Sequence, residues 1–244
     1  MVAARVYRAA GEVMAARGRL RGVADEGGWW PEFASNAEAL DTLVEAIERA
    51  TLRPGEEVGI AIDVAASQLY TGDRYRLAAD GVELETEALV ELLGGWCRHY
   101  PIVSIEDPVA EDDDQGMVSF TAKLGDRIQI IGDDYLVTSA ARVAAAASRD
   151  ACNAVLLKPN QAGTVTETKA ALAAARTAGW RTIVSARSGE TEDVTIVHLA
   201  VGWSAGQLKV GSFARSERMA KWNEGLRIQA ALGPAAPFAG WRRK

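Results

Sequence analysis

Three short apolar segments of the sequence each end in an acidic residue. They are residues 58–63, 102–106 and 128–133, which end at Asp63, Glu106 and Asp133. Because parallel strands end at the same edge of a sheet, three such strands in succession would bring these carboxylates together. Ionised carboxylates a few ångströms apart repel by roughly 4 kcal/mol per pair at an effective dielectric of 20. We therefore expect a hard cation between them, for which all-oxygen ligands indicate Mg²⁺.

Basic residues end or follow three later apolar segments. They are Lys158, Arg187 with its neighbour Ser188, and Lys209. A lysine that is desolvated beside another cation loses its proton more readily, so Lys158 is a candidate general base and Lys209 a candidate second cation. An arginine and a hydroxyl near the start of a helix indicate a phosphate-binding site.

Both groups also have an interpretation without chemistry. The acids could simply face solvent at strand ends, and the lysines could form buried ion pairs with them. Buried ion networks stabilise proteins poorly, so several of them in one place favour a functional site. His99 and His198 lie in helix-like stretches away from the strand ends, where we expect packing rather than chemistry.

The spacing of the apolar segments predicts the fold. Expected strands end near residues 63, 106, 133, 158, 186 and 209, and after the first interval they follow one another at 23 to 28 residues. Such intervals are typical of βα units. Six units in a row favour a barrel, although a complete barrel has eight strands in about 250 residues. The prediction is an α/β fold, an incomplete (β/α)8 TIM-type barrel with six βα units.

Helix propensity, caps and glycines predict the remaining elements. Helices are expected at about residues 2–17, 36–50, 86–99, 116–124, 138–147, 164–177, 192–201 and 216–232. Residues 21–31 are expected to form a loop, residues 70–80 a hairpin-like insert, and Asn36 is expected to cap the second helix. We assign residues 1–232 to the barrel domain and residues 233–244 to a C-terminal tail.

Composition limits the classes of partner and compartment. The 244 residues are 48% hydrophobic and 25% charged, which is typical of a globular chain with one large core. The formal net charge of −6 argues against nucleic acid or an anionic membrane as the main partner. Cys97 and Cys152 lie in apolar surroundings and are expected to be buried thiols. With no signal peptide or membrane-spanning run, the predicted location is cytoplasmic.

Longer stretches around these residues resemble the barrel domain of the enolase (phosphopyruvate hydratase) family. The matching stretches are residues 25–28 (Asp-Glu-Gly-Gly), 63–67, 104–108 (Ser-Ile-Glu-Asp-Pro), 132–134, 157–164, 188–193 and 215–218 (Arg-Ser-Glu-Arg). The resemblance runs from about residue 12 to residue 232. Motifs of this length, in this order, are highly specific.

The resemblance implies a role for each candidate residue. Asp63, Glu106 and Asp133 would bind Mg²⁺ at the substrate carboxylate. Lys158 would remove the proton next to that carboxylate, and Glu26 would assist departure of the hydroxyl. Lys209 would bind the carboxylate, and Arg187 with Ser188 would hold the phosphate.

The sequence also departs from the enolase pattern. Ala186 stands where the family has a substrate-contacting histidine, Pro159 where it has an aliphatic residue, and Tyr135 where it usually has leucine. The N-terminal domain and the first two barrel strands of the family have no counterpart in this sequence. Because six strands of eight would leave open sheet edges, we expect a separate chain to supply that half.

Two functional hypotheses follow. The first is a Mg²⁺-dependent lyase subunit that eliminates water from 2-phosphoglycerate, or from a phosphonate analogue, to give a phosphoenolpyruvate-like product; it would be one half of a split enzyme. The second is a non-catalytic, enolase-like pseudoenzyme or structural subunit. The three acids and two lysines favour the first hypothesis, and the missing histidine favours the second.

Overall fold

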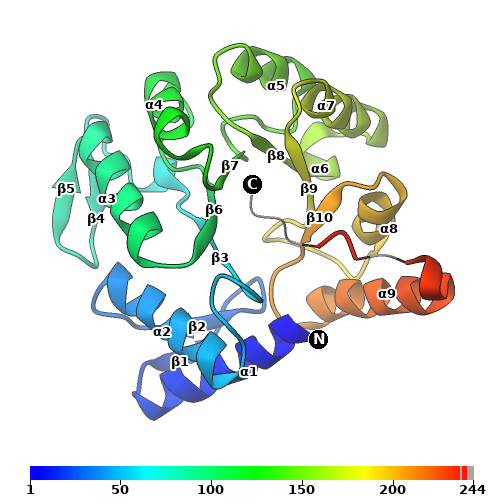
Figure 1. Ribbon diagram of the computed structural model, residues 1–244, viewed down its shortest axis with the longest axis horizontal. Coiled ribbons are helices and arrows are strands. Elements are labelled where there is room, and N and C mark those ends of the chain that lie inside the picture. Colours follow the sequence, from blue (N-terminus) through cyan, green and yellow to red (C-terminus); the bar gives the residue numbers. More distant parts are fainter. Residues whose placement is uncertain (237, 241–244) are drawn as a thin grey trace.

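The computed structural model describes residues 1–236 and 238–240, and its centre is a curled sheet of six parallel strands (Figure 1). Across the sheet the strands follow in sequence order: β3 (Ile60–Asp63), β6 (Ile102–Glu106), β7 (Gln129–Gly132), β8 (Ala154–Leu157), β9 (Arg181–Ser185) and β10 (Gly206–Lys209). β3 and β10 are the two edges of this sheet. The α/β fold and the incomplete barrel are therefore confirmed.

Helices surround the curled sheet (Figure 1). They are α1 (Val2–Ala16), α2 (Asn36–Arg49), α3 (Thr86–His99), α4 (Asp114–Leu124), α5 (Ala140–Ala147), α6 (Pro159–Ala162), α7 (Val165–Thr177), α8 (Thr195–Gly202) and α9 (Ser216–Leu232), with 3-10 turns at Ala66–Gln68 and Gly233–Ala235. All but α6 were expected within a few residues. Pro159 opens this short helix, where its missing N–H costs nothing because the first turn has no intrahelical partner for it.

The register of the strands brings their C-terminal ends to one edge. Asp63 on β3 pairs with Glu106 on β6, and Glu106 pairs in turn with Ile131 on β7. At the other edge of the sheet Lys209 on β10 pairs with Ser185 on β9. Each predicted strand-end residue therefore lies close to those of the neighbouring strands.

The strands alternate between two apolar environments. On β8, Val155 and Leu157 join the main core under the helices, whereas Ala154 and Leu156 belong to a smaller cluster with Ile131 and Ile183. This period of two is the one that a sheet with both faces covered requires. The chain buries both faces, so both parts of the alternation are apolar.

A polar pair also spans the inside of the curl. The side-chain amides of Gln129 on β7 and Gln207 on β10 exchange hydrogen bonds of 2.8 and 3.2 Å. β7 and β10 are not neighbours in the sheet, so these amides meet only because the sheet is strongly curved. Their mutual bonds satisfy polar groups that would otherwise be costly to bury.

Two local predictions were wrong. Residues 21–31 form an antiparallel hairpin, β1 (Leu20–Val23) and β2 (Trp29–Pro31), rather than a loop. Gly27, with φ +76°, lies in the turn, whereas Gly22 lies in β1 and pairs with Trp30. The cap of α2 is Ser35, whose side chain accepts from the N–H of Glu38 at 3.1 Å. Asn36 instead donates its backbone N–H to Asp80 at 3.1 Å.

The expected insert is present and longer than predicted. β4 (Tyr75–Leu77) and β5 (Val82–Leu84) pair antiparallel and lie outside the curled sheet.

Cys97 and Cys152 are free, buried thiols, as expected, and burial raises the pKa of Cys97 to about 11. Of the predicted tail, residues 237 and 241–244 lie outside the described residues, and the domain boundary at residue 232 stays a prediction.

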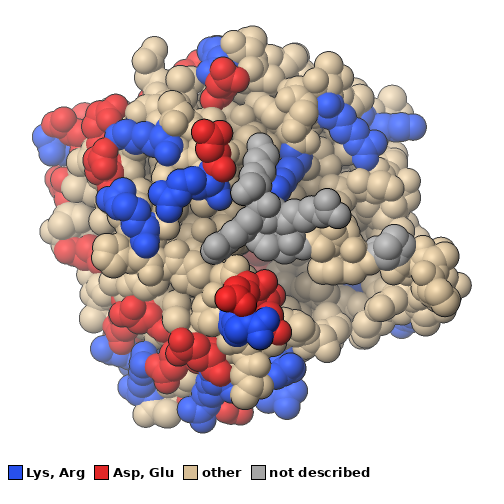
Figure 2. Space-filling model, in the orientation of Figure 1, with Lys and Arg blue, Asp and Glu red and all other residues tan. Residues whose placement is uncertain are grey.

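Charged residues on the surface form local pairs. Figure 2 shows acidic and basic side chains interspersed over one face of the molecule. Exposed pairs such as Arg53 with Glu56, 2.6 Å apart, belong to this pattern. Exposed pairs of this kind contribute little to stability, because water screens the attraction between their charges. In the part of the chain that the structure describes, none of the helices combines the length and apolar character that crossing a membrane requires.

Candidate active site

A cavity of about 200 Å³ lies at the C-terminal ends of the parallel strands. Its lining includes seven of the eight site residues predicted from the sequence, which are Glu26, Asp63, Asp133, Lys158, Arg187, Ser188 and Lys209. The eighth, Glu106, lies beneath, with 3% of its surface exposed. Residues from the N-terminal hairpin, from the C-terminal ends of all six parallel strands and from the loops after them therefore converge on one space.

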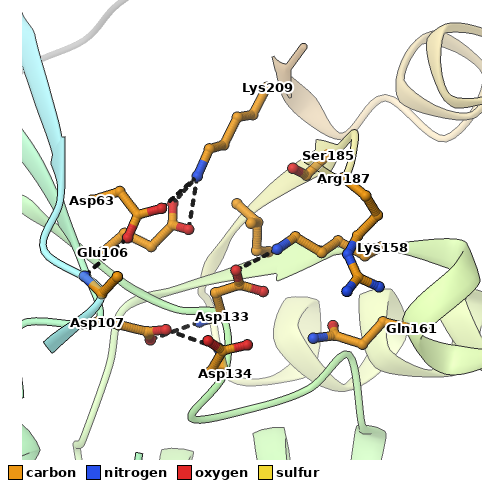
Figure 3. A network of polar contacts seen from close by, with 12 residues as sticks. Asp63, Glu106, Asp107, Asp133, Asp134, Lys158, Gln161, Ser185, Arg187 and Lys209 are labelled. Atoms are coloured by element: carbon orange, nitrogen blue, oxygen red, sulfur yellow. Dashed lines mark hydrogen bonds and ion pairs between the residues drawn. The ribbon is translucent and has the colours of Figure 1, made fainter. Parts of the chain in front are cut away.

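Lys209 connects the two edges of the curled sheet. Its Nζ lies 3.0 Å from Oδ2 of Asp63 and 2.8 and 3.0 Å from the two carboxylate oxygens of Glu106 (Figure 3). Asp63 ends β3 and Lys209 ends β10, so this ion pair crosses the gap between the edge strands. Burial alone would lower the pKa of Lys209, but the charges of Glu106 and Asp63 outweigh it and raise that pKa.

Lys158 is held by a different carboxylate. Its Nζ forms an ion pair with Oδ2 of Asp133, and both side chains are largely buried. Its backbone N–H donates to Oγ1 of Thr138 at 3.0 Å, which fixes the end of β8. Because the two lysines have different carboxylate partners, the role of Lys209 as a second cation beside Lys158 stays a prediction.

The nearby lysines do not fully compensate the negative charge of the carboxylates in this site. Burial raises the pKa of Glu106 to about 8; Lys209 opposes this shift, and the charges of Asp63 and Asp133 add to it. Oδ1 of Asp133 is buried and has no hydrogen-bond partner among the described residues. An orphaned carboxylate oxygen on Asp133, whose charge acts on the buried Glu106, fits a hard divalent cation, and Asp63, Glu106 and Asp133 are the residues that would hold it.

Asp107 was present in the sequence motif but was given no role. Both of its carboxylate oxygens accept backbone N–H groups, from Asp133 at 2.9 Å and from Asp134 at 2.8 Å. Its φ is +41°, a conformation that non-glycine residues rarely adopt. Burial raises its pKa to about 6, although the two backbone hydrogen bonds oppose that shift. Oxygens of Asp107, Asp133 and Asp134 all lie within 4.8 Å of one another.

Asp107 therefore fixes the start of the loop that follows β7. The signal in the sequence was its place directly after Glu106, at a strand end. That signal alone cannot say which of the two carboxylates faces the cavity and which turns back to the chain. Asp134 and Gln68 also line the cavity, and sequence reasoning gave neither a role.

Glu26 reaches the cavity from the turn of the β1–β2 hairpin. Its carbonyl oxygen accepts the N–H of Ser212 at 2.8 Å, and the carbonyl of Gly27 accepts the N–H of Ala214 at 3.2 Å. Nε of Arg215 donates to the carbonyl of Ala24 at 2.9 Å. The hairpin is thus docked on the segment that follows β10, which places Glu26 in the same cavity as Lys209.

A chain of aromatic contacts also packs the hairpin against the C-terminal part of the chain. Tyr7 of α1 stacks on Trp29 of β2 with ring centroids 4.4 Å apart, and it also contacts Phe213 at 5.8 Å. Phe213 stacks in turn on Trp222 of α9 at 4.8 Å. The N-terminal helix and hairpin are therefore packed against the C-terminal part of the chain. Such aromatic pairs contribute about 0.5–1.5 kcal/mol beyond the area that they bury.

Arg187 and Ser188 line the cavity, and Arg187 lies away from Asp63 and Glu106 (Figure 3). Figure 3 shows the Arg187 side chain extending beside Lys158 toward Gln161. Ala186, in the same segment, lines the cavity with 7% of its surface exposed. His99 and His198 are not among the lining residues, as expected; Nε2 of His198 lies 3.1 Å from Glu224 instead.

Comparison with known proteins gives the same architecture. The whole chain, residues 1–244, matches the family model described as enolase, C-terminal TIM barrel domain. Over 236 residues it is 49% identical to "Enolase 1" of Desulfitobacterium hafniense (strain Y51). The matched region covers 96% of this chain and 54% of that relative. The chain thus spans about half the length of the relative. On its sequence and its curled sheet of six parallel strands, the chain belongs to the family of enolase C-terminal TIM barrel domains.

Proposed function

We propose that this chain is the barrel part of an enolase-type lyase, which removes the proton α to a carboxylate and eliminates water from a phosphorylated substrate such as 2-phosphoglycerate. The observation that carries this proposal is that Asp63, Asp133 and two lysines line one cavity, with the buried Glu106 paired to one of those lysines, Lys209. A set of acids alone would suit many sites. Acids together with partly buried lysines supply both a cation site and a base.

The proposed proton transfers use groups on different elements. Lys158 comes from the end of β8 and would take the α proton. Glu26 comes from the β1–β2 turn and would protonate the departing hydroxyl. Because these two groups approach from separate elements, each can act on its own bond of the substrate.

The charge of the cavity supports a metal requirement. Among the described residues that line it, five are acidic and three are basic, and the buried Glu106 adds a further carboxylate. An anionic substrate would be repelled from such a site without added positive charge. Bound Mg²⁺ would neutralise the substrate carboxylate and stabilise the negative charge that develops when the α proton leaves.

The remaining charges of the substrate would meet the basic side of the cavity. Lys209 would bind the carboxylate, and Arg187 with Ser188 would hold the phosphate or phosphonate group.

Ala186 leaves a methyl group where the enolase pattern has an imidazole. We propose on this ground that a phosphonate analogue is the alternative substrate, which a comparison of kcat/KM for both compounds would decide.

The part of Enolase 1 that this chain does not cover would also be needed for activity. The proposal that a separate chain supplies it rests on the two edge strands, β3 and β10, which have no further ladder partner among the described residues. Co-expression with a chain that carries an enolase-like N-terminal half tests it. The expected result is a stable complex that binds Mg²⁺.

The decisive experiment is exchange of the substrate's α proton with deuterated solvent, followed by proton NMR on the assembled enzyme. Exchange that requires both Mg²⁺ and Lys158 supports the lyase. Binding of Mg²⁺ and substrate without any exchange would instead identify a non-catalytic, enolase-like subunit.

A further inference from the structure

Two basic residues of α9 are buried although neither lines the cavity. The relative exposure of Arg218 is 0% and that of Lys221 is 1%. Burying a cation is costly unless its donors are satisfied and its charge is compensated. The contacts of these two side chains therefore show what the helix holds in place.

Both cations bind the segment that follows β9. Nη2 of Arg218 donates to the carbonyl oxygen of Ser188 at 2.6 Å, and Nζ of Lys221 donates to the carbonyl of Thr191 at 2.7 Å. Nη1 of Arg218 also reaches the carbonyl of Val210 at 2.8 Å, at the end of β10. One helix thus holds the main chain after two neighbouring strands.

Glu190 links this support to Arg187. Its Oε1 accepts the backbone N–H of Arg187 at 2.9 Å, and its Oε2 lies 3.1 Å from Nζ of Lys221. The carboxylate therefore compensates a buried charge on one side and fixes the main chain of Arg187 on the other. The side chain of Arg187 makes none of these bonds and stays directed into the cavity (Figure 3).

The bond to Arg218 also orients the peptide between Ser188 and Gly189. This peptide is trans, so its N–H points away from α9 when its carbonyl oxygen faces Arg218. Within the described residues, the N–H of Gly189 has no backbone acceptor. The same segment thus offers a guanidinium, a hydroxyl and an oriented N–H, which are the donors that bind oxyanions.

We propose that Arg218, Lys221 and Glu190 are positioning residues, which hold residues 187–191 in the conformation that binds the anionic group of the substrate. The proposal rests on the proposed function, because it assumes that Arg187 and Ser188 meet that group. None of the three positioning residues contacts the substrate. They act through the main chain of the segment that does.

The test compares Glu190→Gln and Arg218→Lys with Glu224→Gln and Arg227→Lys in the complete enzyme. Glu190→Gln keeps an acceptor for Arg187 but loses the charge beside Lys221, and Arg218→Lys keeps the charge but loses the two-pronged contact. Glu224 and Arg227 form an ion pair on the same helix, 2.9 Å apart, and bind no part of residues 187–191. They are matched controls for helix stability.

The readouts are the dissociation constant of inorganic phosphate, the KM and kcat for the substrate, and the dissociation constant of Mg²⁺. Hydrogen bonds to charged groups contribute enough that losing one should weaken phosphate binding and raise KM by about tenfold. Affinity for Mg²⁺ should change little, because its ligands lie on the other side of the cavity. The controls should leave all values unchanged.

Phosphate and Mg²⁺ affinities that fall together, or a phosphate affinity that does not change, would overturn the proposal in favour of a purely structural role. Should Arg218→Lys fail to fold, Glu190→Gln still decides. The proposed function is tested separately: an unmodified enzyme that binds phosphate but exchanges no α proton contradicts the lyase and leaves the positioning role open to the same measurements. Absence of phosphate binding in the unmodified enzyme overturns the positioning role.

Discussion

The two sides of the cavity are built differently. On the acidic side, Asp63 and Glu106 are the last residues of neighbouring strands, so the hydrogen-bond ladder itself sets their spacing. On the basic side, Arg187 and Ser188 lie beyond the end of β9, in a segment whose shape depends on α9. The main chain of the acids is fixed by the sheet, whereas the segment proposed to bind the anionic group is held by buried cations of α9.

The comparison indicates how one fold separates two tasks. A metal site needs ligands at fixed distances, which strand ends provide. A substrate-binding segment can vary from one relative to another when its support lies in a separate helix. Lys209 is the exception, because it ends β10 and yet reaches the acids of β3 and β6.

The largest effect is expected at the base. Lys158→Ala should lower the rate of α-proton exchange in the complete enzyme by about 10²–10⁴-fold, the usual contribution of a general base. The control is Lys169→Ala, an exposed lysine of α7. Exchange at the unmodified rate in Lys158→Ala would show that the base has been assigned wrongly.

Removing one acid should abolish most of the response to metal. At a Mg²⁺ concentration a hundred times its dissociation constant, binding should stabilise the fold by about 2.7 kcal/mol. Asp133→Asn should lose most of this gain, because it removes the charge of a buried carboxylate that is proposed to bind the metal. Thermal unfolding with and without Mg²⁺, together with any partner chain, measures it; Asp126→Asn, at an exposed acid, is the control. A melting temperature indifferent to Mg²⁺ in the unmodified protein would contradict the metal site.

The support of the acidic side can be weakened without touching a proposed ligand. Asp107 accepts the N–H groups of both Asp133 and Asp134, whereas an asparagine in Asp107→Asn keeps only one acceptor oxygen for them. Asp133 should then be held less firmly, so affinity for Mg²⁺ should fall by about 10–100-fold. Asp113→Asn is the matched control, because Asp113 also accepts a backbone N–H, from Gly116 at 2.8 Å, but caps α4. Calorimetric titration with Mg²⁺ distinguishes them: equal losses in both variants would mean that Asp107 only stabilises the fold.

The smallest effect concerns the docking of the hairpin. A Cβ on Gly211 would lie 2.6 Å from the carbonyl oxygen of Glu26, and φ there is +100°. Gly206, with φ +85°, has nothing within 4 Å of the corresponding position. Replacing either glycine by alanine should lower the free energy of unfolding by about 1–3 kcal/mol, because alanine rarely adopts a positive φ. Gly211→Ala should cost about 1 kcal/mol more, measured by urea unfolding. Equal losses would show that the hairpin tolerates the added methyl group.

The sequence alone determined the order of the six parallel strands and the edge of the sheet at which the candidate residues lie. Apolar runs of four to six residues, separated by helical patterns, predict parallel strands whatever the rest of the chain does. Strand-end positions for Asp63, Glu106 and Asp133 follow directly from that pattern. These inferences succeeded because they depend on neighbours along the chain.

Only the tertiary structure decided which charges meet. Lys209 and Asp63 are 146 positions apart, and their ion pair exists because the sheet curls until its two edges approach each other. The turning back of Asp107, the docking of Glu26 and the support from Arg218 depend on the same curvature and on helices packed outside it. No local pattern encodes that geometry, since it results from how all six strands and their helices share one core.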